Sequence, residues 1–302
     1  MAVAPDIARL IDEICDDRTH GASELARQAA RVLKAVAERS QADDVVGFID
    51  ELGEVGQALM SARSSMAPIR NIVHRILSVI PEQIEAKGIR SLRQFAISRA
   101  DEMIGDSLKA VEQIILRARE IVAIGDKVMT HSYSSTVVAL LKDIASRGRD
   151  IDIIITRSGT GRTGEKIARE LGDCGLPITF VDDTAVGLYM PMVNKVLLGA
   201  DTVCTDGVVN GVGSYPLALM AARHRVPIYI LADTLKFDTG LIREDVDVED
   251  IDGEELIDPA NLPQAVSVSN PHFDMTPLEL ITGVVTEQGI MAPVDVIAFL
   301  SD

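Results

Sequence analysis

The chain has 302 residues and a formal net charge of −17, with 46 acidic and 29 basic side chains, of which only eight are lysines. A chain this acidic is repelled by nucleic-acid phosphates and by anionic membranes, so direct nucleic-acid binding and membrane binding are not expected. The acidic, lysine-poor composition favours a protein of a high-salt cytosol over one with a specific basic partner.

The cysteines and the amino-terminal residues exclude further classes. Cys15, Cys174 and Cys204 show no C-x-x-C spacing and do not cluster with histidine, which argues against a zinc site and a disulfide framework. No basic segment is followed by an apolar run at the amino terminus, and no stretch approaches 18 apolar residues. We therefore expect a soluble cytoplasmic protein that uses no metal and no cofactor.

The first 124 residues favour helices throughout. Five stretches carry apolar residues every three to four positions, the spacing that buries one face of a helix. Ser23 is a candidate N-cap of the second stretch, and Gly125 is a typical residue just beyond the end of the fifth. A helical domain over residues 1–124 therefore precedes a second domain over residues 125–302. The predicted helices are Asp6–Cys15, Ser23–Arg39, Asp44–Met60, Met66–Ile80 and Ser91–Ile124.

Short apolar strands alternate with helical segments between Lys127 and Phe237. The strands are continuously apolar and therefore buried on both faces, which is typical of a parallel sheet covered by helices. This pattern predicts an α/β fold with a doubly wound parallel sheet, whose ligands bind beyond the carboxyl ends of the strands. The predicted strands are Lys127–His131, Ile151–Thr156, Pro177–Val181, Lys195–Gly199 and Pro227–Leu231, and the helices between them are Ser134–Ser146, Gly164–Cys174, Ala185–Met192 and Ser214–His224.

The periodicity weakens after Phe237. Glu244–Glu255 is strongly acidic and has little periodicity, which indicates a solvated loop that continues through Pro259–Pro263. Thr276–Gln288 carries apolar residues at helical spacing and is predicted to be a capped helix. Elements that follow a five-stranded sheet often add an edge strand or complete an interface.

The segment Ser158–Gly164 is rich in glycine and lies between a predicted strand and a predicted helix. Its backbone N–H groups and the positive end of the helix suit a phosphate. The glycines also spell G-x-G-x-x-G, with Asp182 about 20 residues on, the pattern of a dinucleotide site. The loop follows the second strand rather than the first, and its two arginines suit a compact phosphate better; a tight turn without a ligand is the third alternative. The candidate phosphate ligands are Arg157, Gly159, Gly161, Arg162 and Gly164.

Polar residues also follow the first and fourth predicted strands. His131 and Ser132 could include a nucleophile, whereas Ser134 is explained by capping the next helix. Asp201 follows the small residues Gly199 and Ala200, which allow a ligand to approach closely. Its carboxylate is either a general base or a turn residue, and the residue type alone does not decide.

Five motifs, in this order along the chain, resemble one superfamily. It comprises the alpha, beta and delta regulatory subunits of the translation initiation factor 2B exchange factor, the archaeal ribose-1,5-bisphosphate isomerases and the methylthioribose-1-phosphate isomerases. In the helical half, RTHGA (18–22) and ARSSMAP (62–68) resemble its two phosphate-contacting motifs. The resemblance covers nearly the whole chain and implies a helical domain followed by a Rossmann-like domain. The motifs are THSYS (130–134), GAD (199–201), DGVVN (206–210), ADTLKF (232–237) and NPHFDMTP (270–277).

The resemblance also implies roles for single residues. An active member would be an aldose–ketose sugar-phosphate isomerase in which Asp201 and residue 132 form the catalytic pair. It implies a phosphorylated sugar or nucleotide as the ligand, a homo-oligomer with a dimer as its unit, and a translation initiation factor as a candidate partner. The further ligand-binding residues that it implies are Arg18, Gly21, Arg63, His131, Asn210 and Lys236.

The chain differs from the family pattern at several site positions, and the functional prediction depends on these differences. The isomerases have a catalytic cysteine where this chain has Ser132, and a serine hydroxyl is a far weaker acid than a thiol, which titrates near pH 8.5. The family's Asn-Lys pair is Asn210-Gly211 here, and its Arg-Pro pair is Arg157-Ser158. We interpret the chain as a regulatory subunit that senses a sugar phosphate or nucleotide, as the alpha subunit does. Ribose-1,5-bisphosphate isomerase is the alternative, and a nicotinamide dehydrogenase is kept for the glycine pattern alone.

Overall fold

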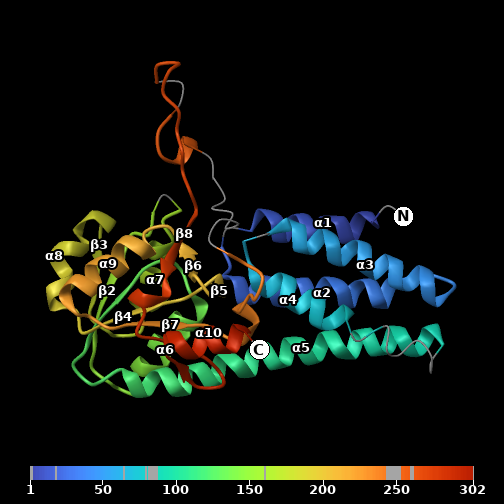
Figure 1. The fold of residues 1–302 in the computed structure, drawn as a ribbon, viewed down its shortest axis with the longest axis horizontal. Helices are drawn as coiled ribbons and strands as arrows, with labels where there is room; N and C mark the ends of the chain where they lie inside the picture. The colour runs from blue at the N-terminus through green and yellow to red at the C-terminus, as the bar shows by residue number, and fades with distance from the viewer. Residues whose placement is uncertain are drawn as a thin grey trace. The chain divides into compact units, whose positions relative to one another are not determined.

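The structure is a computed structural model that describes residues 3–17, 19–63, 65–78, 80, 88–159, 161–242, 253–258 and 262–301. The chain divides into two compact units, Met1–Ala110 and Val111–Asp302, and the division falls within the long helix α5 (Ile89–Ile121). A domain boundary near Gly125, just beyond the end of this helix, stays a prediction. Figure 1 shows the fold, with helices and strands labelled where there is room.

The described residues of the first unit form helices and the turns that connect them, and they form no strand. α2 packs against α1, α3 and α4, and its alanines let these neighbours approach while Leu25 and Leu33 fill the core. Asp44 caps α3 by accepting the N–H of Gly47 at 2.8 Å. Ser23 is not the N-cap of α2, because the helix begins at Ala22 and Gly21 takes the cap position. These helices are α1 (Pro5–Asp16), α2 (Ala22–Arg39), α3 (Val45–Ala62), α4 (Ala67–Leu77) and the first part of α5 (Figure 1).

The second unit is built on a seven-stranded sheet in the order β10-β9-β7-β4-β1-β2-β3. All neighbouring strands are parallel except the edge pair β10 and β9, and the five predicted strands are all present. The strands are β1 (Lys127–Thr130), β2 (Asp152–Thr156), β3 (Ile178–Val181), β4 (Lys195–Leu198), β7 (Ile228–Leu231), β9 (Gly283–Val285) and β10 (Ile290–Met291).

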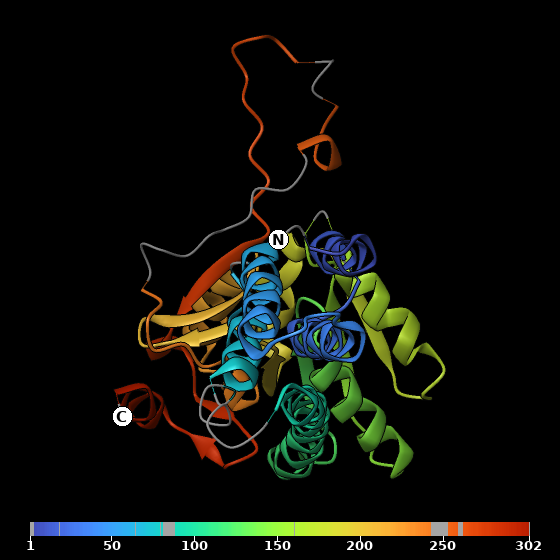
Figure 2. The same cartoon turned by 90° about the vertical axis from the view of Figure 1, so that its right-hand side faces the viewer.

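Helices cover both faces of this sheet, which confirms the doubly wound arrangement. Val128 belongs to a core with α6 (Ser135–Ser146), α7 (Thr163–Gly172) and the end of α5, whereas its neighbour Met129 belongs to a core with α9 (Ser214–His224) and α10 (Pro293–Ser301). Figure 2 shows α6 and α7, green to yellow-green, on one side of the sheet and the red α10 on the other. The short α8 (Val186–Tyr189) precedes β4. Ser134 caps α6 as predicted, since its hydroxyl accepts the N–H of Val137 at 3.3 Å.

A second, antiparallel sheet was not predicted from the sequence. It consists of β5 (Thr202–Cys204), β6 (Gly207–Gly211) and β8 (Phe273–Pro277), in that order. A Cβ on Gly207 would lie 2.4 Å from the carbonyl oxygen of Thr276, so β6 and β8 approach closely only because this residue is glycine.

The predicted helix Thr276–Gln288 is wrong. The segment starts within β8, passes through one 3₁₀ turn at Leu278–Leu280 and then forms β9, which pairs with β7. The acidic run 244–255 lies outside the described residues as far as residue 252. Within the part of the chain that the structure describes, no helix has the length and apolar character needed to cross a bilayer.

Candidate functional site

The strand order of the main sheet reverses between β1 and β4. From β1 the sheet continues through β2 to β3, and from β4 it continues the other way through β7 to β9. Ligands of such sheets bind beyond the carboxyl ends of the strands at this reversal. Here β1 is followed by His131 and Ser132, and β4 by Gly199 and Asp201. A Cβ on Gly199 would lie 2.6 Å from the side chain of Ser134, so glycine lets the two strand ends approach.

Ser132 has a left-handed backbone conformation, with φ of 59°. Ser158, beyond the carboxyl end of β2, shares this conformation with φ of 66°, and the N–H of Ser132 donates to its Oγ at 2.8 Å. The Ser132 hydroxyl lies beside Gly211, where a Cβ would come within 2.4 Å of it. Left-handed residues other than glycine are strained and cluster at functional sites, so this pair marks the strand ends as a candidate site.

His131 is buried, and both of its ring nitrogens have partners. Nε2 lies 2.8 Å from the carbonyl oxygen of Val212, and Nδ1 lies 2.6 Å from the hydroxyl of Thr156. Because a carbonyl can only accept, Nε2 carries the proton, and Nδ1 of the neutral ring accepts from Thr156. Burial lowers the pKa of His131, so the ring stays neutral. His131 is therefore not available as a base for Ser132.

We expect the His131 ring to keep its neutral NMR signature as the pH falls from 8 to 6. The reason is the lowered pKa, which places protonation of this ring below the ordinary histidine range. The measurement is a titration of ring carbon and nitrogen shifts, with the exposed His224 as the comparison. A His131 signal that moves with a midpoint near 6.5 would contradict the assigned neutral state.

Carboxylate side chains bind two backbone N–H groups and one arginine of the glycine loop. The N–H groups of Ser158 and Gly159 donate to the two carboxylate oxygens of Asp183, each at 2.8 Å. Arg162 lies 2.5 Å from the carboxylate of Glu165, and Arg157 is exposed. A phosphate over this loop stays a prediction. In this structure its first two amides already bind an acidic side chain, which the sequence did not indicate because Asp183 lies 24 to 25 residues away.

Two of the loop glycines have different surroundings. A Cβ on Gly164 would lie 1.8 Å from the carbonyl oxygen of Thr156, so α7 begins hard against β2. At Gly161 a Cβ would meet only the side chain of Thr163, at 3.9 Å. The close approach of helix and strand therefore explains Gly164 without a ligand.

Lys236 places a buried positive charge at the carbonyl oxygen of Ala200, the residue that precedes Asp201. Lys236 is 5% exposed, and its Nζ donates a hydrogen bond to the carbonyl oxygen of Ala200 at 2.7 Å. Among the described residues, no carboxylate lies within ion-pair distance of this ammonium group. A buried cation without an anionic partner is costly in free energy, and a bound anion would relieve that cost. The backbone N–H of Asp201 donates to Val209 at 2.8 Å, which ties this strand end to β6.

Asn210 is buried and organises the turn before α9. Its amide donates to the hydroxyl of Ser214 at 2.9 Å, and this hydroxyl donates to the carbonyl of Gly211 at 2.7 Å. The predicted role of Asn210 in ligand binding stays a prediction.

Asp274 of β8 is a site residue that the sequence analysis did not single out, although it lies within the NPHFDMTP motif. Its carboxylate accepts the N–H groups of Gly213 at 2.7 Å and Tyr215 at 3.1 Å, at the start of α9. Burial raises the pKa of Asp274 to about 6, while the two amides oppose this shift. Asp274 thus holds the turn whose Val212 carbonyl fixes the ring of His131.

The remaining predicted residues lie in the first unit. Arg18 lies outside the described residues. Gly21 precedes α2, whose start has no side-chain cap, and the buried Arg63 donates to the carbonyl oxygen of Asp17 at 2.8 Å. Arg63, in the second of the two motifs predicted to contact phosphate, thus contacts the residue directly before the first motif.

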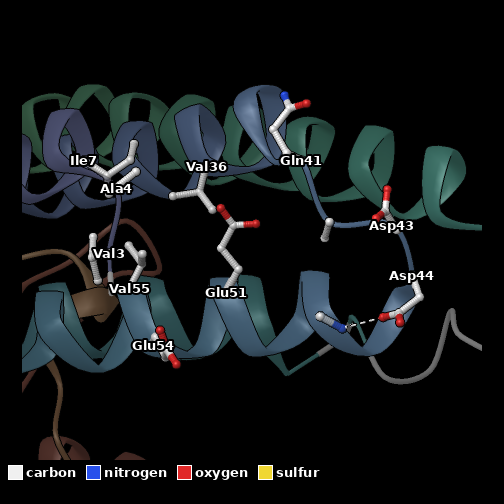
Figure 3. Close-up of a pocket in the computed structure, with 12 residues that line it drawn as sticks. Val3, Ala4, Ile7, Val36, Gln41, Asp43, Asp44, Glu51, Glu54 and Val55 are labelled. Atoms are coloured by element: carbon white, nitrogen blue, oxygen red, sulfur yellow. Dashed lines mark hydrogen bonds between the residues drawn. The ribbon is translucent and has the colours of Figure 1, made fainter. Parts of the chain in front are cut away.

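The first unit also contains a cavity of about 440 Å³ between α1, the end of α2 and α3. Figure 3 shows Val36 and Val55 on its wall and Glu51 and Asp44 around it, with Asp44 bonded to the start of α3. Among the described residues, none that is predicted to bind the ligand lines this cavity, and its acidic side chains would repel a phosphate. Among the described residues, no cluster of histidine, cysteine and acidic side chains could hold a metal ion.

A sequence model of the initiation factor 2 subunit family matches residues 18–293. The chain is 32% identical over 311 residues to the ribose 1,5-bisphosphate isomerase of Thermococcus kodakarensis, covering 100% of this chain and 96% of that protein. It is 29% identical to the protein of the same name from Haloferax volcanii, covering 99% of this chain and 93% of that one.

Solved structures share the fold over almost the whole chain. The translation initiation factor eIF-2B of Pyrococcus horikoshii OT3 has a TM-score of 0.83 and 28% identity, covering 96% of this chain and 98% of that chain. The 5-methylthioribose 1-phosphate isomerase of the same organism has a TM-score of 0.80 and 21% identity, covering 98% and 87%. At that identity, the second likeness concerns the fold alone.

Proposed function

This chain belongs to the initiation factor 2 subunit family, and we propose that within it the protein is an aldose–ketose isomerase acting on ribose 1,5-bisphosphate. The names of its relatives at about 30% identity support this choice over the regulatory subunit predicted from the sequence. The observation that carries the proposal is the buried Lys236, a cation bonded to the carbonyl just before Asp201 and without an anionic partner among the described residues.

The proposed chemistry needs two kinds of group. A base removes a proton from one carbon of the sugar and returns it to the neighbouring carbon, while a second group manages the proton of the adjacent oxygen. Asp201 is the proposed base, and Ser132 stands where the second group is expected. Lys236 is the proposed partner of a phosphate or of the developing oxygen anion.

The direct test is turnover of ribose 1,5-bisphosphate by the purified protein, with the ketose product measured. In the same preparation, Lys236→Met should weaken sugar-phosphate binding by about 1.5–3 kcal/mol, the usual worth of a hydrogen bond to a charged group. Because the substitution removes a buried charge, the melting temperature of the free protein should stay level or rise. Calorimetric titration and a thermal melt check the two effects.

Lys142→Met is the matched control, since Lys142 pairs with Glu170 on the exposed surface of α6. It should leave affinity unchanged. Equal affinities of the wild type and Lys236→Met would contradict the proposed contact.

A regulatory subunit that binds a sugar phosphate without converting it is the second candidate. The observation that favours it is Ser132 itself, a weak acid whose neighbour His131 has both ring nitrogens occupied. Tight binding of the sugar phosphate without product formation would favour this candidate over the isomerase.

We expect the protein to form a dimer through the sheet unit and the segment after Asn270. The expectation comes from the family resemblance, and closed two-fold symmetry is the commonest arrangement of soluble homo-oligomers. Light scattering at micromolar concentration and high salt measures the mass. A value near the 32.5 kDa of a single chain would count against the dimer.

A further inference from the structure

We propose that Asp183 and Ser158 are positioning residues that hold Ser132 in its left-handed conformation through a chain of hydrogen bonds across β3, β2 and β1. Their effect on turnover rests on the isomerase function proposed above. The hydrogen-bond chain itself rests on the contacts alone, and the two parts can be tested separately.

The first link joins the end of β3 to the end of β2. Asp183 lies in the 3₁₀ turn Asp183–Ala185, just beyond β3, and each of its carboxylate oxygens accepts one N–H from the consecutive residues Ser158 and Gly159. Both of these residues are left-handed, with φ of 66° and 68°. Charge-assisted bonds from a carboxylate are stronger than neutral ones, so Asp183 can hold a conformation that a serine rarely adopts.

The second link joins the end of β2 to the end of β1. The hydroxyl of Ser158 donates to the carbonyl oxygen of Thr156 at 3.1 Å, which leaves its oxygen to accept the N–H of Ser132 at 2.8 Å. The direction of both bonds is therefore fixed. In its left-handed conformation Ser158 combines the carboxylate contact of its amide with these two contacts of its hydroxyl, and Ser132 is the last member of the chain.

Pairing with His131 does not explain Asp183. The carboxylate lies 3.7 Å from Nδ1, which is beyond hydrogen-bond distance, and Nδ1 is already 2.6 Å from the hydroxyl of Thr156. Burial lowers the pKa of His131, so the ring carries no charge that would attract a carboxylate. The first two amides of the glycine loop therefore bind the Asp183 carboxylate of this same chain, and this contact holds the end of β2 to the end of β3.

Amide hydrogen exchange at single residues tests the chain of bonds. Asp183→Asn should speed exchange at Ser158, Gly159 and Ser132 by about tenfold or more, because an amide oxygen replaces only one of the two acceptors. Ser158→Gly should speed exchange at Ser132 and leave Gly159 protected, because glycine adopts the same φ without strain and only the hydroxyl is lost.

Asp182→Asn is the matched control at the neighbouring carboxylate. Asp182 is exposed, and its side chain accepts from the N–H and hydroxyl of Thr184. This variant should change exchange at none of the three amides and should leave turnover at the wild-type level.

In the isomerase assay, Asp183→Asn and Ser158→Gly should lower kcat by a factor of roughly 10–100 with KM nearly unchanged, the effect of a misplaced reacting group. The proposal is overturned if Asp183→Asn speeds exchange at Ser158 and Gly159 but not at Ser132, since Asp183 would then shape only its own loop. If Asp183→Asn does not fold, unchanged exchange at Ser132 in Ser158→Gly overturns it equally. Absence of turnover in the wild type would refute the isomerase function, while the exchange measurements would still decide the positioning role.

Discussion

Replacing Ser132 by cysteine is expected to raise the rate of ribose 1,5-bisphosphate isomerisation by a factor of roughly 10²–10⁴, the usual worth of a matched acid–base group. A thiol titrates near pH 8.5, whereas a serine hydroxyl would need a strong adjacent base. His131 does not supply that base because both ring nitrogens are engaged. The Ser132 hydroxyl packs directly against Gly211, where a Cβ would come within 2.4 Å of it, so glycine at position 211 is needed beside the thiol as it is beside the hydroxyl. Initial rates at several substrate concentrations measure the effect.

Two further variants make this result specific. Ser132→Ala should be slower than the wild type if the hydroxyl takes part, and equal to it if the hydroxyl is a bystander. Adding Asp201→Asn to the cysteine variant should abolish the gain, because the thiol acts only with the base. If the wild type already matches Ser132→Cys, the missing-thiol explanation fails, and the second proton-handling group is a residue other than Ser132.

The central part of the fold could be predicted because its signals are local. A strand such as Ile151–Thr156 is apolar throughout, and this composition alone predicts burial on both faces. The segment after Thr276 shows the opposite case. Its leucines and isoleucine have helical spacing, but β9 pairs with β7, and that contact overrides the local pattern. The short β5 and β6 also depend on a distant partner, since β6 pairs with β8 more than 60 residues later.

The strand ends that carry the candidate site residues could be predicted from the sequence, but the contacts of these residues could not. The ends of the predicted strands single out His131, Ser132 and Asp201, because each of them lies at or just after a strand end. The state of His131 could not be predicted, because Thr156 and Val212 lie 25 and 81 residues away. The backbone donors of the glycine loop predict an anion site, but Asp183, the carboxylate of this same chain that accepts two of them, lies 24 to 25 residues away and has no local signal.

The free energy of unfolding should depend on pH through the protonation of Asp274. Burial raises its pKa from 3.8 to about 6 in the folded protein. Between these two values the folded state binds a proton that the unfolded state does not, so the contribution of Asp274 to the free energy of unfolding falls as pH rises from about 4 to 6. The contribution becomes constant well above pH 6, where the carboxyl is ionised in both the folded and the unfolded state. A difference of about two pKa units corresponds to about 3 kcal/mol.

Other carboxylates make the free energy of unfolding rise with pH. The effect of Asp274 therefore has to be measured as a difference between the wild type and Asp274→Asn. Although burial opposes the shift, Arg31 and Arg27 lower the pKa of Glu24, and such groups make the protein more stable as pH rises. Denaturant titrations of both proteins at one salt concentration cancel these shared terms. The stability of the wild type relative to Asp274→Asn should fall by about 3 kcal/mol between pH 4 and pH 7. A difference that stays level or grows would mean that the amides of Gly213 and Tyr215, with the positive end of α9, outweigh burial and keep the carboxylate ionised.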